Sequence, residues 1–320
     1  MQEIMVKAAW LYHVEGLTQA QIGERLNLTR RRVNELLAAA LQNGLVRISF
    51  ASPLAENVAL EAELASRFGL SDVVVAPTPA DPAQLHSVLG RAAAGFLDRT
   101  IPVLKPSAIG VGWGATLRQT VQHMRQRSEP QIGICSMMGG LMHGAEINTF
   151  EIVRSFAQVL GAYCHYFAAP VYADSGTSRD LIVAQPVFRE LLDEAASVEM
   201  TFLSVGDVTG QSLQVRYGLP KQVDIASIVA AGGVGDLLGY YLDENGRPID
   251  HPVNKQAISV ELGSYKRVPC RIVASGGPHK RDILRALLRA RLATVIVTDA
   301  DTARWLLINN ASGEAAENSS

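Results

Sequence analysis

The sequence predicts an α/β protein in two parts, an N-terminal helix-turn-helix and a large, mostly parallel α/β domain. Short amphipathic helical patterns follow one another over residues 4–43, and from residue 73 onward β-rich segments alternate with helical patterns. Alternation of this kind is typical of a parallel sheet with helices on both faces. We expect a helix-turn-helix domain over 1–52, a linker helix within 53–69, the large domain over 70–308 and a disordered tail over 309–320, which is rich in Ser, Asn, Glu and Ala.

Composition excludes several classes of protein. With 320 residues, 48% of them hydrophobic, the chain is long enough to bury a substantial core. Its net charge of −2 argues against a general polyanion binder, but residues 1–52 hold six of the basic and four of the acidic side chains, a local charge of +2. Three widely spaced cysteines, no long apolar run and no signal-peptide pattern predict a cytoplasmic protein with no membrane association.

The helical patterns at the N-terminus cover residues 4–14, 19–26 and 30–43. Thr18 and Gln21 form a capping-box pattern before the second helix, and Thr29 is placed to cap the third. Asn27 tolerates the left-handed backbone that the intervening turn often needs. Gly44 ends the third helix, and the apolar run 45–50 predicts a strand.

The third helix is predicted to bury one face and expose the other. By helical spacing, the side chains that face the core of this unit are those of Val33, Leu36, Leu37, Ala40 and Leu41. The side chains that face solvent are those of Arg30, Arg31, Asn34, Glu35 and Ala38. Cations in a first helical turn oppose the helix dipole at a cost of roughly 0.3–1 kcal/mol each, which an approaching DNA phosphate would relieve.

In a helix-turn-helix the N-terminal residues of the second helix of the pair enter the major groove. Arg30, Arg31 and Asn34 are therefore candidates for base edges, since Arg suits guanine and Asn suits adenine. Thr18, Gln19 and Thr29 suit phosphates. The full set of candidate DNA-binding residues is Thr18, Gln19, Thr29, Arg30, Arg31, Arg32 and Asn34. The alternative is a small helical bundle whose arginines form a solvated face.

The large domain begins after a helix predicted over 55–68. Its predicted strands are 73–76, 108–111, 132–137, 163–168, 200–205, 271–275 and 294–298. Ligands of such sheets bind beyond the carboxyl ends of the strands, often with a phosphate on a glycine-rich turn at a helix N-terminus.

Glycine-rich loops occupy this position after several predicted strands. These loops are 110–116, 138–141, 206–212 and 275–280, and Asn148 follows the second of them. The glycine-rich segment 232–236 adds the carboxylate of Asp236. Each loop alone also fits a tight strand-to-helix turn. Together they predict a polar pocket for a small phosphorylated polyol.

Catalytic and nucleotide-binding alternatives are weaker. Gly110, Gly112 and Ala115 fit the dinucleotide pattern G-x-G-x-x-G/A, but the following strand lacks the acid that would bind the ribose. The histidines lack metal-ligand spacing, and the sequence contains neither a nucleophile elbow nor a P-loop. His143 and His279 flank proposed pocket loops.

These pieces together resemble the SorC family of bacterial transcriptional regulators over nearly the whole chain. The resemblance is carried by segments 17–37, 110–116, 232–236, 243–246, 275–280 and 297–307. It departs from the family at Gly23, where alanine is usual, and at Asn27, where glycine is usual.

The resemblance implies a winged helix-turn-helix joined to an effector domain similar in fold to ribose-5-phosphate isomerase and glucosamine-6-phosphate deaminase. It also implies sugar-phosphate effectors and tetramers built from dimers. It also implies that Gly112, Trp113, Gly114 and Thr116 line the phosphate site with Lys280, and that Asp236 meets sugar hydroxyls.

We therefore expect a regulator of a carbohydrate or polyol operon, without enzymatic activity or cofactor. Its partners would be operator DNA, a phosphorylated sugar or polyol, and further copies of itself in a dimer or tetramer. The candidate effector-binding residues are Gly112, Trp113, Gly114, Thr116, Gly139, Gly140, Asn148, Asp207, Ser212, Asp236 and Lys280.

Two alternatives remain. One is a sugar-phosphate isomerase or deaminase with an appended DNA-binding module, in which Asp236 or Asp207 acts as general base with help from His143. The other is a structural nucleoid protein, which the acidic large domain disfavours.

Overall fold

The computed structural model describes residues 2–46, 54–141 and 148–309. The chain divides into two compact units, Met1–Ala55 and Glu56–Ser320.

The described part of the smaller unit contains α1 (Gln2–His13), α2 (Gln19–Leu26) and α3 (Arg30–Gln42). Their shared core is made of Met5, Ala8, Ala9, Leu11, Ile22, Val33, Leu36, Leu37 and Ala40. Both predicted caps are confirmed: the Thr18 hydroxyl oxygen accepts a hydrogen bond from the Gln21 amide at 3.3 Å, and that of Thr29 accepts from the Arg32 amide at 3.2 Å. Asn27 adopts the expected left-handed backbone with φ 52°.

The turn between α2 and α3 explains the glycine at position 23. A Cβ on Gly23 would lie 2.7 Å from the carbonyl oxygen of Leu28, so this turn passes too close to α2 for a side chain.

One prediction for this unit is wrong, and another concerns residues that the structure mostly does not describe. Leu41 is 43% exposed rather than buried, because Ala40 and Leu37 hold the centre of the apolar stripe and Leu41 lies at its margin. Leu45 and Val46 form a bend, and the rest of the predicted strand 45–50 lies outside the described residues, as does the predicted tail beyond Asn309.

The larger unit is built on a parallel sheet, which confirms the predicted α/β class. The seven described strands run in the order β1-β10-β9-β5-β2-β3-β4, and all neighbours are parallel. Their bounds are β1 Asp72–Ala76, β2 Ala108–Val111, β3 Gly133–Ser136, β4 Tyr163–His165, β5 Met200–Leu203, β9 Cys270–Ala274 and β10 Val295–Asp299. Each begins within one residue of its predicted start.

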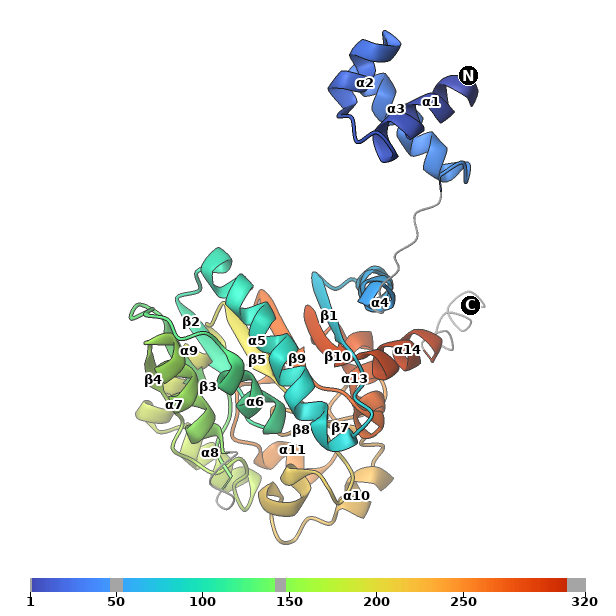
Figure 1. Ribbon diagram of the computed structural model, residues 1–320. Coiled ribbons are helices and arrows are strands. Elements are labelled where there is room, and N and C mark those ends of the chain that lie inside the picture. Colours follow the sequence, from blue (N-terminus) through green and yellow to red (C-terminus); the bar gives the residue numbers. More distant parts are fainter. Residues whose placement is uncertain (1, 47–53, 142–147, 310–320) are drawn as a thin grey trace. The chain divides into compact units, whose positions relative to one another are not determined.

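Helices cover both faces of this sheet (Figure 1). One face packs under α5 (Leu85–Leu104), α6 (Ala115–His123) and α7 (Thr149–Leu160). The other packs under α4 (Leu54–Phe68), α9 (Pro186–Ala196), α13 (Arg281–Arg289) and α14 (Ala300–Ile308). Because both faces are covered, strands β3, β5 and β10 are buried along their whole length rather than at alternate residues, whereas the edge strand β4 is largely exposed.

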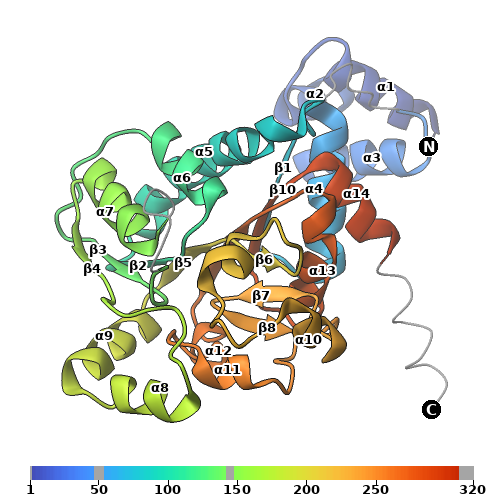
Figure 2. The ribbon, with the colours of Figure 1, turned by 90° about the horizontal axis from the view of Figure 1, so that it is seen from below.

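A small antiparallel sheet lies beside the carboxyl end of the large one (Figure 2). It comprises β6 (Gly206–Asp207), β7 (Gly235–Leu237) and β8 (Tyr240–Leu242). Within the described residues, the remaining helical segments are 3-10 turns at Pro82–Gln84 and Pro278–Lys280, a π-helix at Gln214–Gly218, and the helices α8 (Gly176–Val183), α10 (Ile225–Ala230), α11 (Pro252–Gln256) and α12 (Leu262–Tyr265). Among the described residues we find no helix with the length and apolar content that crossing a membrane requires.

Candidate functional site

A cavity of about 470 Å³ opens where three central, adjacent strands of the parallel sheet end. Segment 112–116 follows β2, segment 203–207 follows β5 and segment 275–280 follows β9, and all three line the cavity. This volume falls in the range of about 300–1,000 Å³ that is typical of small-molecule sites.

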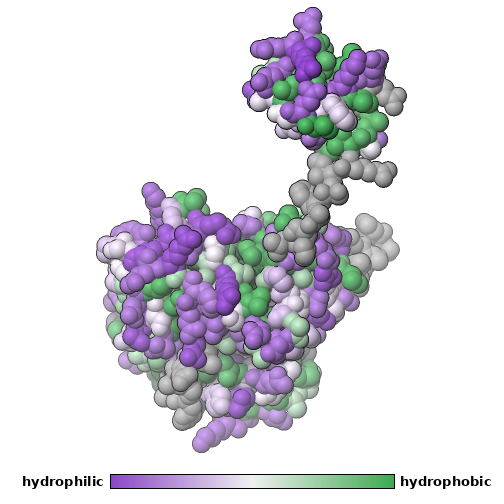
Figure 3. Space-filling view, in the orientation of Figure 1, coloured by the Kyte–Doolittle hydropathy of each residue, from purple (hydrophilic) through white to green (hydrophobic). Residues whose placement is uncertain are grey.

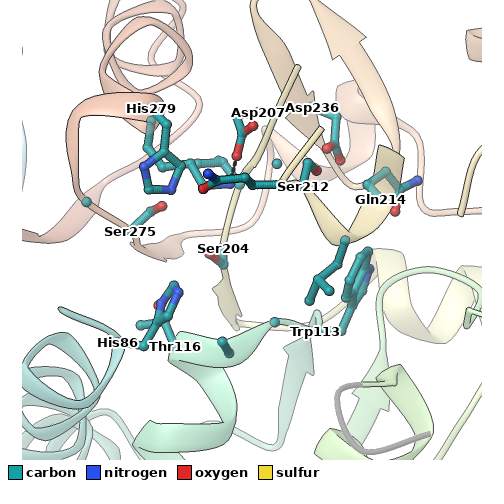
Figure 4. Close-up of a pocket in the computed structure, with 18 of the residues that line it drawn as sticks. His86, Trp113, Thr116, Ser204, Asp207, Ser212, Gln214, Asp236, Ser275 and His279 are labelled. Atoms are coloured by element: carbon teal, nitrogen blue, oxygen red, sulfur yellow. Dashed lines mark hydrogen bonds and ion pairs between the residues drawn. The ribbon is translucent and has the colours of Figure 1, made fainter. Parts of the chain in front are cut away.

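One wall is formed by the turn from β2 into α6 (Figure 4). Gly114 precedes the helix with φ 136°, a backbone angle that side chains rarely allow. Since the first amides of a helix have no intrahelical acceptor, those of Ala115 and Thr116 remain available to a ligand. The Thr116 hydroxyl lies 3.0 Å from Nδ1 of His86. Burial, reinforced by the nearby charges of Lys280 and His279, lowers the pKa of His86, so the imidazole is neutral at neutral pH.

The opposite wall carries a buried ion pair. Nζ of Lys280 lies 2.7 Å from Oδ2 of Asp207, and the two side chains are 12% and 3% exposed. Burial alone would raise the pKa of Asp207, but the charge and hydrogen bond of Lys280, with the hydrogen bonds of Thr209, outweigh it and lower that pKa. The Asp207 carboxyl group is therefore ionised at neutral pH.

Asp236 lies beside this pair and is only half satisfied. Its Oδ2 accepts from the Gly239 amide at 3.1 Å, while its buried Oδ1 makes no hydrogen bond. Burial raises the pKa of Asp236 to about 6, with Lys280 acting in the opposite direction. The carboxylate reaches this position because residue 206 is glycine: a Cβ there would lie 1.8 Å from Oδ1.

Asp299 at the end of β10 fixes the loop that carries His279 and Lys280. Its Oδ1 accepts from the Gly277 amide and from the Thr302 hydroxyl, each at 2.7 Å. A Cβ on Gly276 would lie 2.2 Å from the same oxygen, so the glycine pair allows the loop to close over the carboxylate.

Eight predicted effector-binding residues line this cavity. They are Gly112, Trp113, Gly114, Thr116, Asp207, Ser212, Asp236 and Lys280. His279 lines it too, whereas His143 lies outside the described residues.

The structure does not bring Gly139, Gly140 and Asn148 into the cavity. The Gly139 and Gly140 amides donate to the carbonyl oxygens of Ile258 and Ala169. The Asn148 side chain hydrogen-bonds both the amide and the carbonyl oxygen of Leu141. These hydrogen bonds hold neighbouring chain segments together. This structural role accounts for the three residues, and no ligand contact is needed to explain them.

Several lining residues were not singled out from the sequence. They are His86, Ser204, Gln211, Gln214 and Ser275. Gln211 and Ser275 belong to predicted pocket loops. No sequence motif marks His86 or Gln214. They reach the cavity only through the fold, His86 from the start of α5 and Gln214 from the π-helix.

The predicted DNA-reading face of α3 is exposed, as expected. Arg31 and Arg32 both pair with Glu35, at 3.2 and 2.9 Å, which offsets part of the positive charge at the start of α3. Hydrogen bonds from these arginines lower the pKa of Glu35. Nε2 of Gln19 donates to Oδ1 of Asn34 at 3.3 Å and links α2 to the exposed face.

Comparison with known proteins identifies the family. Residues 52–308 match the family model described as "Putative sugar-binding domain". The chain belongs to the SorC family of sugar-binding transcriptional regulators. Residues 5–43 of the regulator match "Sigma-70, region 4", which covers most of α1 and all of α2 and α3.

The relatives cover nearly the whole chain. The regulator is 28% identical over 306 residues to the erythritol catabolism regulatory protein EryD of Brucella abortus, covering 95% of the regulator and 96% of that protein. It is 27% identical over 310 residues to the deoxyribonucleoside regulator of Bacillus subtilis, covering 96% and 97%. The full-length sorbitol operon regulator SorC from Klebsiella pneumoniae is 26% identical with a TM-score of 0.73, over 96% of the regulator and 100% of that chain. The chain is thus a DNA-binding transcriptional regulator controlled by a sugar effector.

Proposed function

We propose that the effector is a phosphorylated sugar or polyol, that it binds in the cavity, and that it controls a carbohydrate or polyol operon without being chemically changed. The distribution of polar groups carries the proposal. Hydrogen-bond donors gather at the start of α6, and two carboxylates, Asp207 and Asp236, lie on the opposite wall.

The start of α6 suits the phosphate. Free amides and the helix dipole favour an anion there, and the Thr116 hydroxyl adds a donor. A phosphate beside Asp236 would be repelled by a buried carboxylate whose Oδ1 has no hydrogen-bond donor, so the hydroxyl-bearing end of the ligand belongs on that side.

Binding of a phosphorylated ligand is tested with Thr116→Val. We expect titration calorimetry to show that polyol phosphates bind the wild type at least tenfold more tightly than the parent polyols, and that most of this preference is lost in the variant. The matched control is Thr120→Val, whose hydroxyl donates to the Thr116 carbonyl oxygen at 2.8 Å and does not line the cavity. The ligand recovered afterwards should be unchanged. Equal affinity for polyol and polyol phosphate, or turnover of the ligand, would contradict the proposal.

For operator DNA, we propose that Arg30, Arg31 and Asn34 contact base edges, and that Thr18, Gln19, Thr29 and Arg32 lie near the phosphate backbone. The hydroxyl oxygens of Thr18 and Thr29 already cap helices, so these residues act mainly by fixing the helix starts that face the DNA.

Arg30→Ala is expected to weaken operator binding by about 1–3 kcal/mol and to relax the preference at one base pair. Arg30 is exposed at the first position of α3, where a guanine contact is accessible. Competition binding against operators substituted at single positions measures both effects. The control is Arg25→Ala, which removes a cation paired with Glu15 at 2.8 Å. An unchanged base preference in Arg30→Ala would rule out this contact.

We also propose that the regulator works as a homo-oligomer, a dimer or a tetramer. A module with a charge of only +2 neutralises few phosphates, so pairing of modules would raise its affinity for DNA. The smaller unit also exposes apolar side chains along α1 (Figure 3). Among them, Val6 is 47% and Trp10 is 58% exposed. The number of chains bound per operator fragment tests this, and one chain per fragment would contradict it.

A further inference from the structure

Gln214 is a buried cavity residue whose side-chain amide is unsatisfied. It is 1% exposed, and neither Oε1 nor Nε2 makes a hydrogen bond. It begins the π-helix Gln214–Gly218, and such helices often occur at functional sites. Gly218 leaves room for the side chain, since a Cβ there would lie 3.0 Å from Oε1 of Gln214.

Asp236 presents a further unsatisfied atom to the same end of the cavity. Its Oδ1 makes no hydrogen bond, and Figure 4 shows Asp236 and Gln214 on the same side of the view, away from His86 and Thr116. Buried polar groups are rarely left unpaired, so three such atoms on two cavity residues need an explanation.

The Tyr172 hydroxyl can satisfy only one of these atoms. Its hydrogen is donated to the Gly239 carbonyl oxygen, so toward Gln214 its oxygen can only accept, from Nε2. It supplies no hydrogen to the two acceptors, Oε1 of Gln214 and Oδ1 of Asp236. The carboxyl group of Asp236 is likewise occupied only on its Oδ2 side, by the Gly239 amide. A bound ligand is therefore the natural partner of these atoms.

The three atoms define what that ligand must offer. Oε1 of Gln214 and Oδ1 of ionised Asp236 accept hydrogen bonds, while Nε2 of Gln214 donates. Two hydroxyl groups on neighbouring carbons satisfy this set, because each hydroxyl donates one hydrogen bond and accepts others. A ligand that lacks one of these hydroxyl groups would leave buried polar atoms unpaired. A phosphate group at this position would be repelled by the Asp236 carboxylate.

We propose that Gln214 and Asp236 together bind two neighbouring hydroxyl groups at the end of the effector remote from its phosphate, and that Gln214 selects polyols over their deoxy analogues. This inference rests on the proposed function, which places the phosphate at the start of α6. The effector class is accordingly a polyol phosphate with a free terminal diol.

Gln214→Met tests the proposal, since methionine keeps the length of the side chain and removes both polar atoms. The ligands are erythritol 4-phosphate, ribitol 5-phosphate and sorbitol 6-phosphate, each beside its analogue deoxygenated at carbon 2, together with inorganic phosphate as a competitor. Titration calorimetry gives the affinities, and thermal unfolding gives the stability of the free protein. The matched control is Gln256→Met, which removes a buried amide that does not line the cavity and whose Oε1 is also unsatisfied.

We expect Gln214→Met to weaken binding of the polyol phosphates by about 10- to 100-fold, and Gln256→Met to leave it unchanged. Deoxygenation weakens binding to the wild type by a similar factor but has little further effect on Gln214→Met, as a coupled contact requires. Inorganic phosphate should compete with the polyol phosphate equally well for the wild type and for Gln214→Met. The melting temperature of ligand-free Gln214→Met should not be lowered, because the substitution removes unsatisfied polar atoms.

If deoxygenation of the ligand weakens its binding to Gln214→Met as much as its binding to the wild type, while inorganic phosphate still competes, Gln214 does not bind the diol. In that case this inference fails and the proposed function stands. If the polyol phosphates bind the wild type but phosphate does not compete, the phosphate assignment fails while the hydroxyl-binding role is retained. If none of these ligands binds the wild type, both are overturned.

Discussion

Replacing Lys280 with methionine is expected to lower the free energy of unfolding by about 3–5 kcal/mol. The substitution leaves the Asp207 carboxylate, 3% exposed in the ion pair, without its cation. Thr209 hydrogen-bonds the other carboxylate oxygen and does not replace the lost charge. A buried charge without compensation is among the few causes of so large a loss.

The effect of pH on this variant has a definite sign. In the wild type the pKa of Asp207 lies below its ordinary value of 3.8, so the stability that this group contributes is present above that value and is lost as pH falls through the folded-state pKa. Without Lys280, burial raises the pKa of Asp207, and ionisation then destabilises the fold as pH rises. The loss should therefore be larger at pH 7.5 than at pH 5.

Urea unfolding of the wild type, Lys280→Met and the double variant Asp207→Asn with Lys280→Met measures the effect. The double variant should recover most of the lost stability, because no charge is left buried. A loss below about 1 kcal/mol in the single variant would mean that Asp207 is solvated once Lys280 is removed.

The elements that were predictable from the sequence are those whose pattern is local. Strands β3, β5 and β10 are short, mostly apolar runs that are buried along their whole length, so their positions follow from the residues alone. The helix caps at Thr18 and Thr29 depend on residues three positions apart and are likewise local. The small sheet was missed because β6 and β7 contain two and three residues, too few for any periodicity.

The cavity shows where local reasoning stops. Gly139 and Gly140 follow a strand as Gly112 and Gly114 do, yet their amides pair with neighbouring chain segments instead of facing the cavity. A glycine-rich turn looks the same in sequence in either case. The burial of Gln214 and the approach of His86 to Thr116 depend on contacts between distant segments, which no short motif encodes.

The second large effect concerns the coupling between the two ligands of the regulator. We expect a saturating polyol phosphate to change operator affinity by about 5- to 150-fold, a coupling free energy of about 1–3 kcal/mol. Such a change requires the effector to bind the DNA-competent and DNA-incompetent arrangements unequally. By linkage, operator DNA must change effector affinity by the same factor.

Thr116→Val separates coupling from DNA binding itself. Thr116 belongs to the larger unit and the DNA-binding face to the smaller one, so the variant should bind the operator normally in the absence of effector. It should need a much higher effector concentration for the same change. Salt must be held constant, because DNA affinity alone falls with a slope of about −0.9 per phosphate neutralised.

The most direct test is the operator affinity of the full chain, measured by fluorescence anisotropy on a DNA fragment selected by the protein itself, with and without each polyol phosphate. At least one polyol phosphate should change that affinity fivefold or more, with two or four chains bound per fragment, and its unphosphorylated parent should not. An operator affinity that no polyol phosphate alters, at concentrations that saturate the cavity, would contradict the account.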